Sequence, residues 1–199
     1  MRADAAMLDS TAITYAEALL RGRGLELLGP CDGLTQRFAQ WKHDAMLLED
    51  LSQAEADTLG GFMPLLRASA RQPLIIEGEV GDWMLLLLSG TVDVTKRSDS
   101  GAVSRLAVIK AGASVGEMSM MDGAPRYASC VALEEVHAGL LTRDAIKLLI
   151  RDHPAIGAKL LVKLTQMLAQ RLRNTSNQLV KTLGAKAVPL SAGPAPEKA

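Results

Sequence analysis

The stretch that decides the fold runs from Leu74 to Glu117 and reads LIIEGEVGDWMLLLLSGTVDVTKRSDSGAVSRLAVIKAGASVGE. Short apolar runs alternate in it with glycines and with the turn sequence SDSG. This spacing is typical of strands joined by tight turns, so we expect several successive hairpins and a small barrel or jelly roll. TVDVTK alternates with period two, whereas MLLLL is continuously apolar and fits a strand buried on both faces. The last strands should lie in SCVALEEVHAGLLT, which ends at Thr142.

The residues before this stretch favour helices. AITYAEALLRG should form one helix, and LTQRFAQWKHDAMLL a second short one, so residues 1–47 are expected to be helical. We expect this segment to pack on the main domain, with a partner-binding arm as the alternative. Ser52 and Glu55 form a capping-box pattern, which predicts a further helix to about Leu66, irregular where glycine and proline interrupt it.

The residues after Thr142 also have the helical period. Thr142 can cap a short helix, and Pro154 can open a long one that runs to about Leu183. Its apolar stripe recurs every three or four residues, as a helix that packs along a partner helix does. The members of the stripe are Leu161, Leu164, Leu168, Leu172, Thr175 and Leu179. Residues 184–199 are rich in alanine and proline and should be disordered.

The expected fold class is therefore α+β: a small β jelly-roll barrel flanked by N-terminal helices and a long C-terminal helix. We divide the chain into an N-terminal helical extension at 1–47, a β-barrel domain at 48–152, a dimerisation or hinge helix at 153–183 and a tail at 184–199.

The composition excludes several classes of function. Lysine and arginine number 22 against 22 aspartates and glutamates, whereas a large nucleic-acid surface normally brings a basic excess. Cys31 and Cys130 form no CxxC pair, and His43, His137 and His153 have no paired spacing, so neither a disulfide framework nor a metal site is expected. We see no secretory pattern and no apolar run long enough to span a bilayer, so we expect a cytoplasmic protein without a membrane contact.

The most specific stretch is SVGEMSMMDGAPRYASCVA, from Ser114 to Ala132. The arginine in it, Arg126, offers a planar fork that can pair two ways with a phosphate, and Gly116 lets a backbone approach a ligand closely. Glu117 cannot hold a phosphate but can accept a hydrogen bond from a sugar hydroxyl. A short helical turn from Met118 would add free N–H groups. Together these groups suggest a nucleotide monophosphate, and the simpler alternative is a surface ion pair between Glu117 and Arg126.

This stretch resembles the phosphate-binding cassette of the cyclic nucleotide-binding domain family. The family pattern is an apolar residue, Gly, Glu, any residue, a small residue, an apolar residue, a spacer, Arg, a small residue, Ala, then Ser or Thr. It is matched by Val115, Gly116, Glu117, Met118, Ser119, Met120, the spacer MDGAP, Arg126, Tyr127, Ala128 and Ser129. A second family element is matched by Leu74, Ile75, Gly78, Glu79, Gly81, Met84 to Leu87, and Gly90. The resemblance covers roughly residues 47–183.

The resemblance implies a role for each cassette residue. Glu117 would bind the ribose 2′-hydroxyl and Arg126 an exocyclic oxygen of the cyclic phosphate, with the backbone at Gly116 and around Tyr127 and Ala128 completing the cradle. The departure from the pattern is Tyr127, since the family usually has Ala, Ser or Thr there, and a hydroxyl at that position touches the phosphate or helps to select guanine. The choice between cyclic AMP and cyclic GMP therefore stays open at this position.

The long helix is similar to the dimerisation helix of the catabolite activator branch, especially in RLRNTSNQL. In that branch a Thr–Ser pair contacts the adenine, with the Ser coming from the partner subunit, and Thr175 and Ser176 occupy the matching positions. The alternative is a polar break in a coiled-coil stripe. The branch continues into a winged helix-turn-helix, for which this sequence shows no counterpart, so DNA is not an expected partner.

The sequence therefore predicts a stand-alone cyclic nucleotide receptor that favours cyclic AMP, forms a homodimer through its long helix and signals to an unidentified protein partner. The alternatives are a DNA-binding regulator of the catabolite activator type and a degenerate scaffold with an altered nucleotide ligand. No nucleophile or paired acid accompanies Glu117, so we expect neither an enzyme nor a cofactor other than the nucleotide ligand.

Overall fold

The computed structural model describes residues 10–38 and 41–184 of the 199-residue chain. The chain divides into two compact units, residues 1–164 and 165–199. The first unit holds both β-sheets and the start of the long helix, and the second holds the rest of that helix. The predicted disordered tail lies outside the described residues, except for Gly184.

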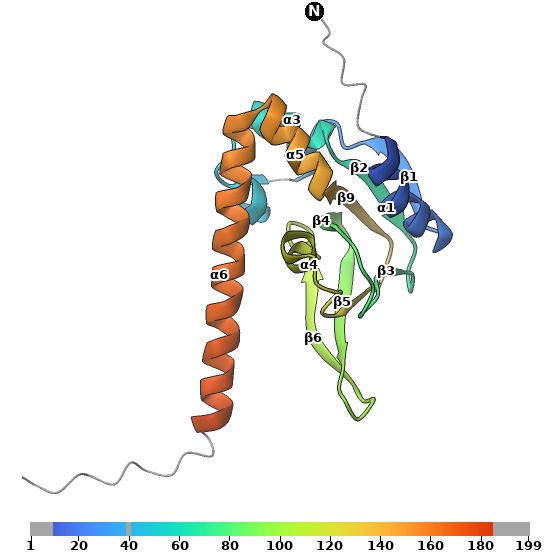
Figure 1. The fold of residues 1–199 in the computed structure, drawn as a ribbon, viewed down its shortest axis with the longest axis vertical. Helices are drawn as coiled ribbons and strands as arrows, with labels where there is room; N and C mark the ends of the chain where they lie inside the picture. Colours follow the sequence, from blue (N-terminus) through green and yellow to red (C-terminus); the bar gives the residue numbers. More distant parts are fainter. Residues whose placement is uncertain (1–9, 39–40, 185–199) are drawn as a thin grey trace, which may run out of the picture. The chain divides into compact units, whose positions relative to one another are not determined.

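The first unit contains two antiparallel sheets. A five-stranded sheet has the order β1-β2-β9-β4-β7, and a four-stranded sheet has the order β3-β8-β5-β6 (Figure 1). The strands are β1 Glu26–Pro30, β2 Pro64–Ala68, β3 Pro73–Ile75, β4 Trp83–Ser89, β5 Thr91–Arg97, β6 Val103–Lys110, β7 Ser114–Val115, β8 Ser129–Ala132 and β9 Val136–Thr142. The expected succession of short strands between residues 73 and 142 is confirmed.

Helices precede and follow these strands. The α-helices are α1 Ser10–Gly22, α2 Trp41–Asp44, α3 Gln53–Gly61, α4 Glu117–Asp122, α5 Arg143–Asp152 and α6 Pro154–Gly184, and the 3-10 helices are η1 Leu34–Arg37 and η2 Met46–Leu48. The predicted α+β jelly-roll class, with N-terminal helices and a long C-terminal helix, is confirmed. None of the described helices is long and apolar enough to cross a membrane.

The core lies between the two sheets and is closed partly by α1. The first six residues of β4 are all buried, which confirms the strand predicted to be buried on both faces. Ala16 and Leu20 of α1, both fully buried, belong to the same apolar cluster as the strand residues Trp83 and Leu85. Within the described residues, α1 therefore packs on the main domain, as expected of this segment.

The expectation that residues 1–47 are purely helical is wrong at two places. Residues 26–30 form the edge strand β1, which pairs with β2 and is pinned by an ion pair between Glu26 and Arg67. The second predicted helix is broken into η1, α2 and η2. Asp57 of α3 accepts hydrogen bonds from both the backbone N–H and the hydroxyl of Thr35, each at 3.0 Å. This tertiary contact fixes η1 as a single tight turn, whatever the helical propensity of its neighbours.

The capping box of Ser52 and Glu55 is present, but the helix that it starts ends at Gly61 and not near Leu66. Pro64 opens β2 instead, and Leu66 is fully buried opposite β9. Gly60 has a packing reason to be glycine, because a Cβ there would lie 2.4 Å from the carbonyl oxygen of Cys31. Long-range pairing with β9 therefore outweighs the local helical pattern.

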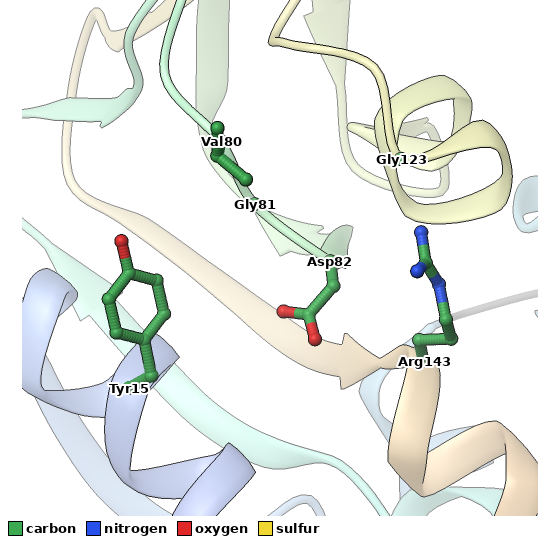
Figure 2. Close-up of a pocket in the computed structure, with 6 residues that line it drawn as sticks. All are labelled: Tyr15, Val80, Gly81, Asp82, Gly123 and Arg143. Carbon is green, nitrogen blue, oxygen red and sulfur yellow. The ribbon is translucent and has the colours of Figure 1, made fainter.

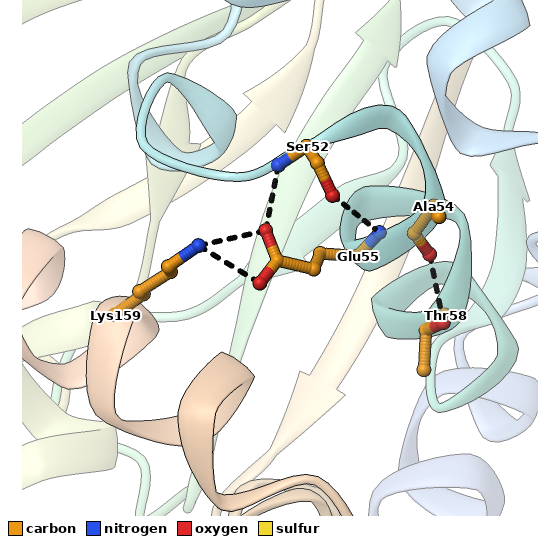
Figure 3. Close-up of polar contacts among 5 residues, drawn as sticks. All are labelled: Ser52, Ala54, Glu55, Thr58 and Lys159. Carbon is orange, nitrogen blue, oxygen red and sulfur yellow. Dashed lines mark hydrogen bonds and ion pairs between the residues drawn. The ribbon is translucent and has the colours of Figure 1, made fainter.

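A polar cluster, which we call the helix clamp, joins α3 to the first turns of α6 and consists of Ser52, Glu55 and Lys159. The Glu55 carboxylate accepts from the Ser52 backbone N–H at 2.7 Å, and Lys159 Nζ donates to both carboxylate oxygens at 2.8 Å (Figure 3). Nearby, Lys163 pairs with Glu49 and Asp50. Within the first unit, charge-assisted bonds therefore hold the first turns of α6 against α3 and residues 49–50.

Both predicted starts of the C-terminal helices are confirmed. The hydroxyl of Thr142 accepts a hydrogen bond from the N–H of Ala145 and caps α5, and Pro154 is the first residue of α6. In the second unit the apolar stripe of α6 is open to solvent, since Leu172 is 69% exposed and Leu179 is 57% exposed.

Candidate nucleotide site

The cassette begins where β7 turns directly into the short helix α4. Gly116 makes this turn with φ 87°, in the left-handed region that favours glycine. The turn places Glu117 and Ser119 inside, with exposures of 1% and 3%, while Met118 is 40% exposed. The predicted helical turn is present, and Glu117 and Ser119 are brought to the interior beside Gly116.

Arg126 returns to the same place from the other end of the cassette. Its N–H donates to the carbonyl of Glu79 at 2.8 Å, and its carbonyl accepts from the N–H of Gly78 at 2.9 Å. The side chain is only 3% exposed. The cassette and the loop between β3 and β4 are therefore paired through their backbones, and the guanidinium lies beneath that loop.

The guanidinium of Arg126 has one hydrogen-bond partner and one aromatic partner. Nη1 donates to the carbonyl oxygen of Gly116 at 2.9 Å, and the guanidinium carbon lies 4.2 Å from the ring centre of Trp83. Nη2 is buried and has no hydrogen-bond partner among the described residues. A buried, unused N–H group is costly for the protein alone, and it is what an anionic ligand would satisfy.

Two glycines make the space that the guanidinium occupies. A Cβ on Gly81 would lie 2.6 Å from Nη2 of Arg126, and a Cβ on Gly116 would lie 2.8 Å from Nη1. Any side chain at either position would push the guanidinium aside. We call the group formed by Gly81, Trp83, Gly116, Glu117 and Arg126 the anion cradle.

Burial lowers the pKa of Arg126 from 12.5 to about 10, and the like charge of Arg23 adds to this effect, while the nearby Cys130, Asp82 and Glu79 oppose it. The guanidinium still carries its charge at neutral pH. A buried positive charge of this kind is one that an anion can pair with.

The simpler interpretation of the motif, a surface ion pair between Glu117 and Arg126, is wrong because both side chains are buried. No group of three or more histidines, cysteines or acidic residues that could hold a metal ion lies within the part of the chain that the structure describes.

Tyr127, the departure from the family pattern, lies outside the cradle. Its side chain is 56% exposed, and Lys96 Nζ lies 4.5 Å from the centre of its ring. Lys96 is held in turn by Glu77, at 2.8 Å. The phenol therefore does not fill the space around Arg126. Ala128, the next residue, is half-buried.

Thr175 and Ser176, the predicted base contacts, lie on the part of α6 in the second unit. Both are exposed, and the hydroxyl of Thr175 donates to the carbonyl of Arg171 at 3.0 Å. Their contact with a ligand remains a prediction.

A cavity of about 320 Å³ opens beside the cradle. Its lining residues are Tyr15, Val80, Gly81, Asp82, Gly123 and Arg143. Figure 2 shows Tyr15 of α1 on one side, Arg143 of α5 on the other and Asp82 between them. Arg143 is fixed by α4, because its Nε donates to the carbonyl of Met120 at 2.7 Å.

Sequence reasoning did not select Trp83, Arg143 or Arg23 as residues of the site. Trp83 looked like the start of an apolar run, and nothing local marks it as the platform for an arginine far along the chain. Arg143 was visible only as the first residue of a helix. The one usable signal was the sequence GDW at 81–83, in which a glycine and a carboxylate precede an aromatic residue.

Comparison with known proteins agrees with this geometry. The family model of the cyclic nucleotide-binding domain matches residues 65–153. The crystal structure of a cyclic nucleotide-binding domain from Methylobacillus flagellatus is 33% identical, with a TM-score of 0.70, and the match covers 84% of this chain and 92% of that one. The chain therefore belongs to the cyclic nucleotide-binding domain family.

Two longer regulatory proteins are also similar. The CRP-like cAMP-activated global transcriptional regulator of Mycobacterium tuberculosis is 37% identical over 103 residues, which are 52% of this chain and 44% of that protein. The cAMP-dependent protein kinase regulatory subunit of Yarrowia lipolytica is 30% identical over 122 residues, 60% of this chain and 32% of that protein. This chain thus spans less than half the length of either relative.

Proposed function

We propose that this protein is a cyclic nucleotide receptor that favours cyclic AMP. The observation that carries the proposal is the Arg126 guanidinium, which is buried, charged and left with one unused N–H in a space that depends on glycine at positions 81 and 116. A cyclic phosphodiester carries one negative charge, which one guanidinium can neutralise through charge-assisted hydrogen bonds.

Three residues of the cradle and three residues outside it have roles in this proposal. Arg126 binds an exocyclic phosphate oxygen, and Glu117 accepts a hydrogen bond from the ribose 2′-hydroxyl. Backbone groups of Gly116 and Ala128 complete the contacts to the phosphate. Thr175 and Ser176 contact the base. Nothing in these roles requires a nucleophile or a proton transfer, so the protein acts as a regulator and not as an enzyme.

Cyclic AMP is favoured because the relatives from Mycobacterium tuberculosis and Yarrowia lipolytica are both named for it. The output is a movement of α6 that a protein partner recognises in the cytoplasm. The proposed divisions of the chain are 1–47, 48–152, 153–183 and 184–199, and β1, within the first of them, belongs to the sheet of the barrel.

Thermal unfolding with added nucleotide tests the ligand. A ligand at a hundred times its dissociation constant stabilises the protein by about 2.7 kcal/mol, so we expect a clear rise in Tm with cyclic AMP and a smaller one with cyclic GMP. Linear 5′-AMP, which carries a second negative charge, is the control. Absence of any shift at millimolar cyclic AMP contradicts the proposal, and a larger shift with another nucleotide would indicate the altered-ligand alternative.

Sedimentation velocity tests the homodimer. Leu172 and Leu179 are seven positions apart and lie on one face of α6, where a dimer would bury them. The double variant Leu172→Glu, Leu179→Glu should sediment as a monomer and the parent as a dimer. The same sample, applied to DNA at low salt, tests the transcriptional alternative, because retention that falls steeply with salt is expected only of a DNA-binding protein.

A further inference from the structure

Arg23, just after α1, makes one contact with strand β3 and one with the segment after it, which covers the cradle. Its Nη1 donates to the carbonyl of Leu74 at 3.1 Å, and its Nη2 forms an ion pair with Glu79. The Arg23 side chain is 10% exposed, whereas the Glu79 side chain is 33% exposed. One guanidinium therefore joins strand β3 to Glu79 in the loop between β3 and β4.

That same segment lies over Arg126. Glu79 accepts the backbone hydrogen bond of Arg126 at 2.8 Å, and Gly81 is packed against Nη2. Since Arg126 is only 3% exposed and Nη2 is buried, an anion from solvent cannot reach that N–H unless the segment moves. Arg23, which holds this segment through Glu79, therefore affects how easily an anion reaches Arg126.

α1 is itself anchored beside the site. Ala16 and Leu20 are fully buried in the same apolar cluster as Trp83, the platform for Arg126. Tyr15, the residue before Ala16, lines the cavity that Gly81 and Asp82 border (Figure 2). Arg23 thus extends from an anchored helix to a segment whose glycines allow it to move.

We propose that Arg23 is a positioning residue that straps residues 76–82 over Arg126 and keeps the anion cradle closed until nucleotide binds. This inference rests on the proposed function. Nucleotide binding then breaks the contact between Arg23 and Glu79, so the ligand state of the cradle is transmitted to α1 and β1. Arg23 itself need not touch the ligand.

The expected change in nucleotide affinity follows from the fraction of the protein in which the cradle is closed. The apparent affinity of a ligand falls in proportion to the fraction of protein that can accept it. A partly exposed ion pair favours the closed state by a modest factor, up to about fivefold. Removing the strap should therefore tighten apparent binding by up to about fivefold.

Stopped-flow association measures this directly, with a fluorescent cyclic AMP analogue labelled at C8 of adenine, away from the phosphate and ribose. Arg23→Gln should bind the analogue faster than the parent, and Arg21→Gln, which removes the same charge from an exposed position two residues earlier, at the end of α1, should not. Glu79→Gln should also speed association, and the double variant should gain little over Arg23→Gln because both substitutions break the contact between Arg23 and Glu79. Slower or unchanged association in Arg23→Gln overturns the proposal.

A second measurement needs no nucleotide. In a Trp41→Phe background Trp83 is the only tryptophan, and it is 1% exposed. Acrylamide should quench the fluorescence of Trp83 more strongly in Arg23→Gln than in the Trp41→Phe parent. In Arg21→Gln the quenching should equal that of the parent. If no variant binds cyclic AMP but quenching rises, the proposed function fails and the strap stands. If binding is intact but neither association nor quenching changes, the strap fails alone.

Discussion

The anion cradle and the helix clamp use similar side chains in opposite ways. In the clamp, the Glu55 carboxylate is bonded to the Ser52 N–H and to Lys159, at the surface. In the cradle, the Arg126 guanidinium is buried, yet Nη2 has no partner among the described residues. One cluster is complete within the protein, and the other is incomplete.

This difference separates a structural polar cluster from a binding site. Completed surface contacts hold elements together with small individual energies. An incomplete buried cation lowers stability until something else supplies the missing contact. Ligand binding should therefore depend on the cradle much more than on the clamp, which the following substitutions test in order of expected effect.

The substitution Arg126→Gln should have the largest effect. A hydrogen bond to a charged group contributes about 1.5–3 kcal/mol, so cyclic AMP affinity should fall by roughly tenfold to a hundredfold. Isothermal titration calorimetry measures the loss. The matched control is Arg105→Gln on β6, which removes an exposed arginine paired with Asp93. Equal affinity in the two variants would mean that the cradle does not bind the phosphate.

Alanine at Gly116 should be the next most disruptive. A left-handed backbone costs a residue with a Cβ about 1–2 kcal/mol, and that Cβ would also displace Nη1 of Arg126. Chemical denaturation should show this loss of stability together with weaker nucleotide binding. Gly61→Ala is the control, because no atom lies within 4 Å of a Cβ there and its φ is not positive. If Gly116→Ala has the stability and nucleotide affinity of the parent, the cradle has room for a Cβ at this position and the proposed close packing against Arg126 is wrong.

Tyr127 is a useful intermediate case between the cradle and the clamp. It belongs to the cassette, but its side chain lies at the surface, as the clamp residues do. Tyr127→Thr should change the unfolding free energy by no more than about 1 kcal/mol, the size of an exposed cation–π contact. The family resemblance implies that a hydroxyl here helps to select guanine. The ratio of cyclic GMP to cyclic AMP affinity should therefore rise by about twofold to tenfold, as for one neutral hydrogen bond. An unchanged ratio would place base selection elsewhere.

The smallest effect at neutral pH should come from Glu55→Gln in the clamp. The hydrogen bond from Lys159, followed by that from the Ser52 N–H, lowers the pKa of Glu55 from 4.5 to about 2. Since the folded-state pKa is depressed, the contribution to stability is present above 4.5 and is lost as the pH falls toward 2. The Tm difference between parent and variant should shrink over that window, while nucleotide affinity at neutral pH stays the same. A difference independent of pH would indicate that the charge of Glu55 is not what matters.

Sequence alone predicted what depends on local spacing. The strands from 73 to 142, the caps at Ser52 and Thr142 and the start of α6 all follow from turns, periods and capping residues. The cassette was also readable, because Gly116, Glu117 and Arg126 lie within one short stretch and their chemistry suggests an anion and a sugar.

Sequence could not predict what depends on distant partners. β1 is an exposed edge strand that exists because β2 is beside it, and β2 overrides a helical pattern by pairing with β9. The stacking of Arg126 on Trp83 and the bridge from Arg23 to Glu79 join residues far apart in the chain. Tyr127 stands where the family usually has a small residue, and only the structure shows that its side chain is exposed and leaves the cradle free of the phenol.

The junction at Thr142 has a mechanical consequence. Thr142 is the last residue of β9 and also the cap of α5, so no linker separates strand from helix. The next residue, Arg143, donates its side chain to the carbonyl of Met120 in α4 and its backbone N–H to the carbonyl of Asp82. Because no flexible residue separates β9 from α5, and Arg143 is bonded to α4, we expect any shift of the cassette to be passed directly to α5.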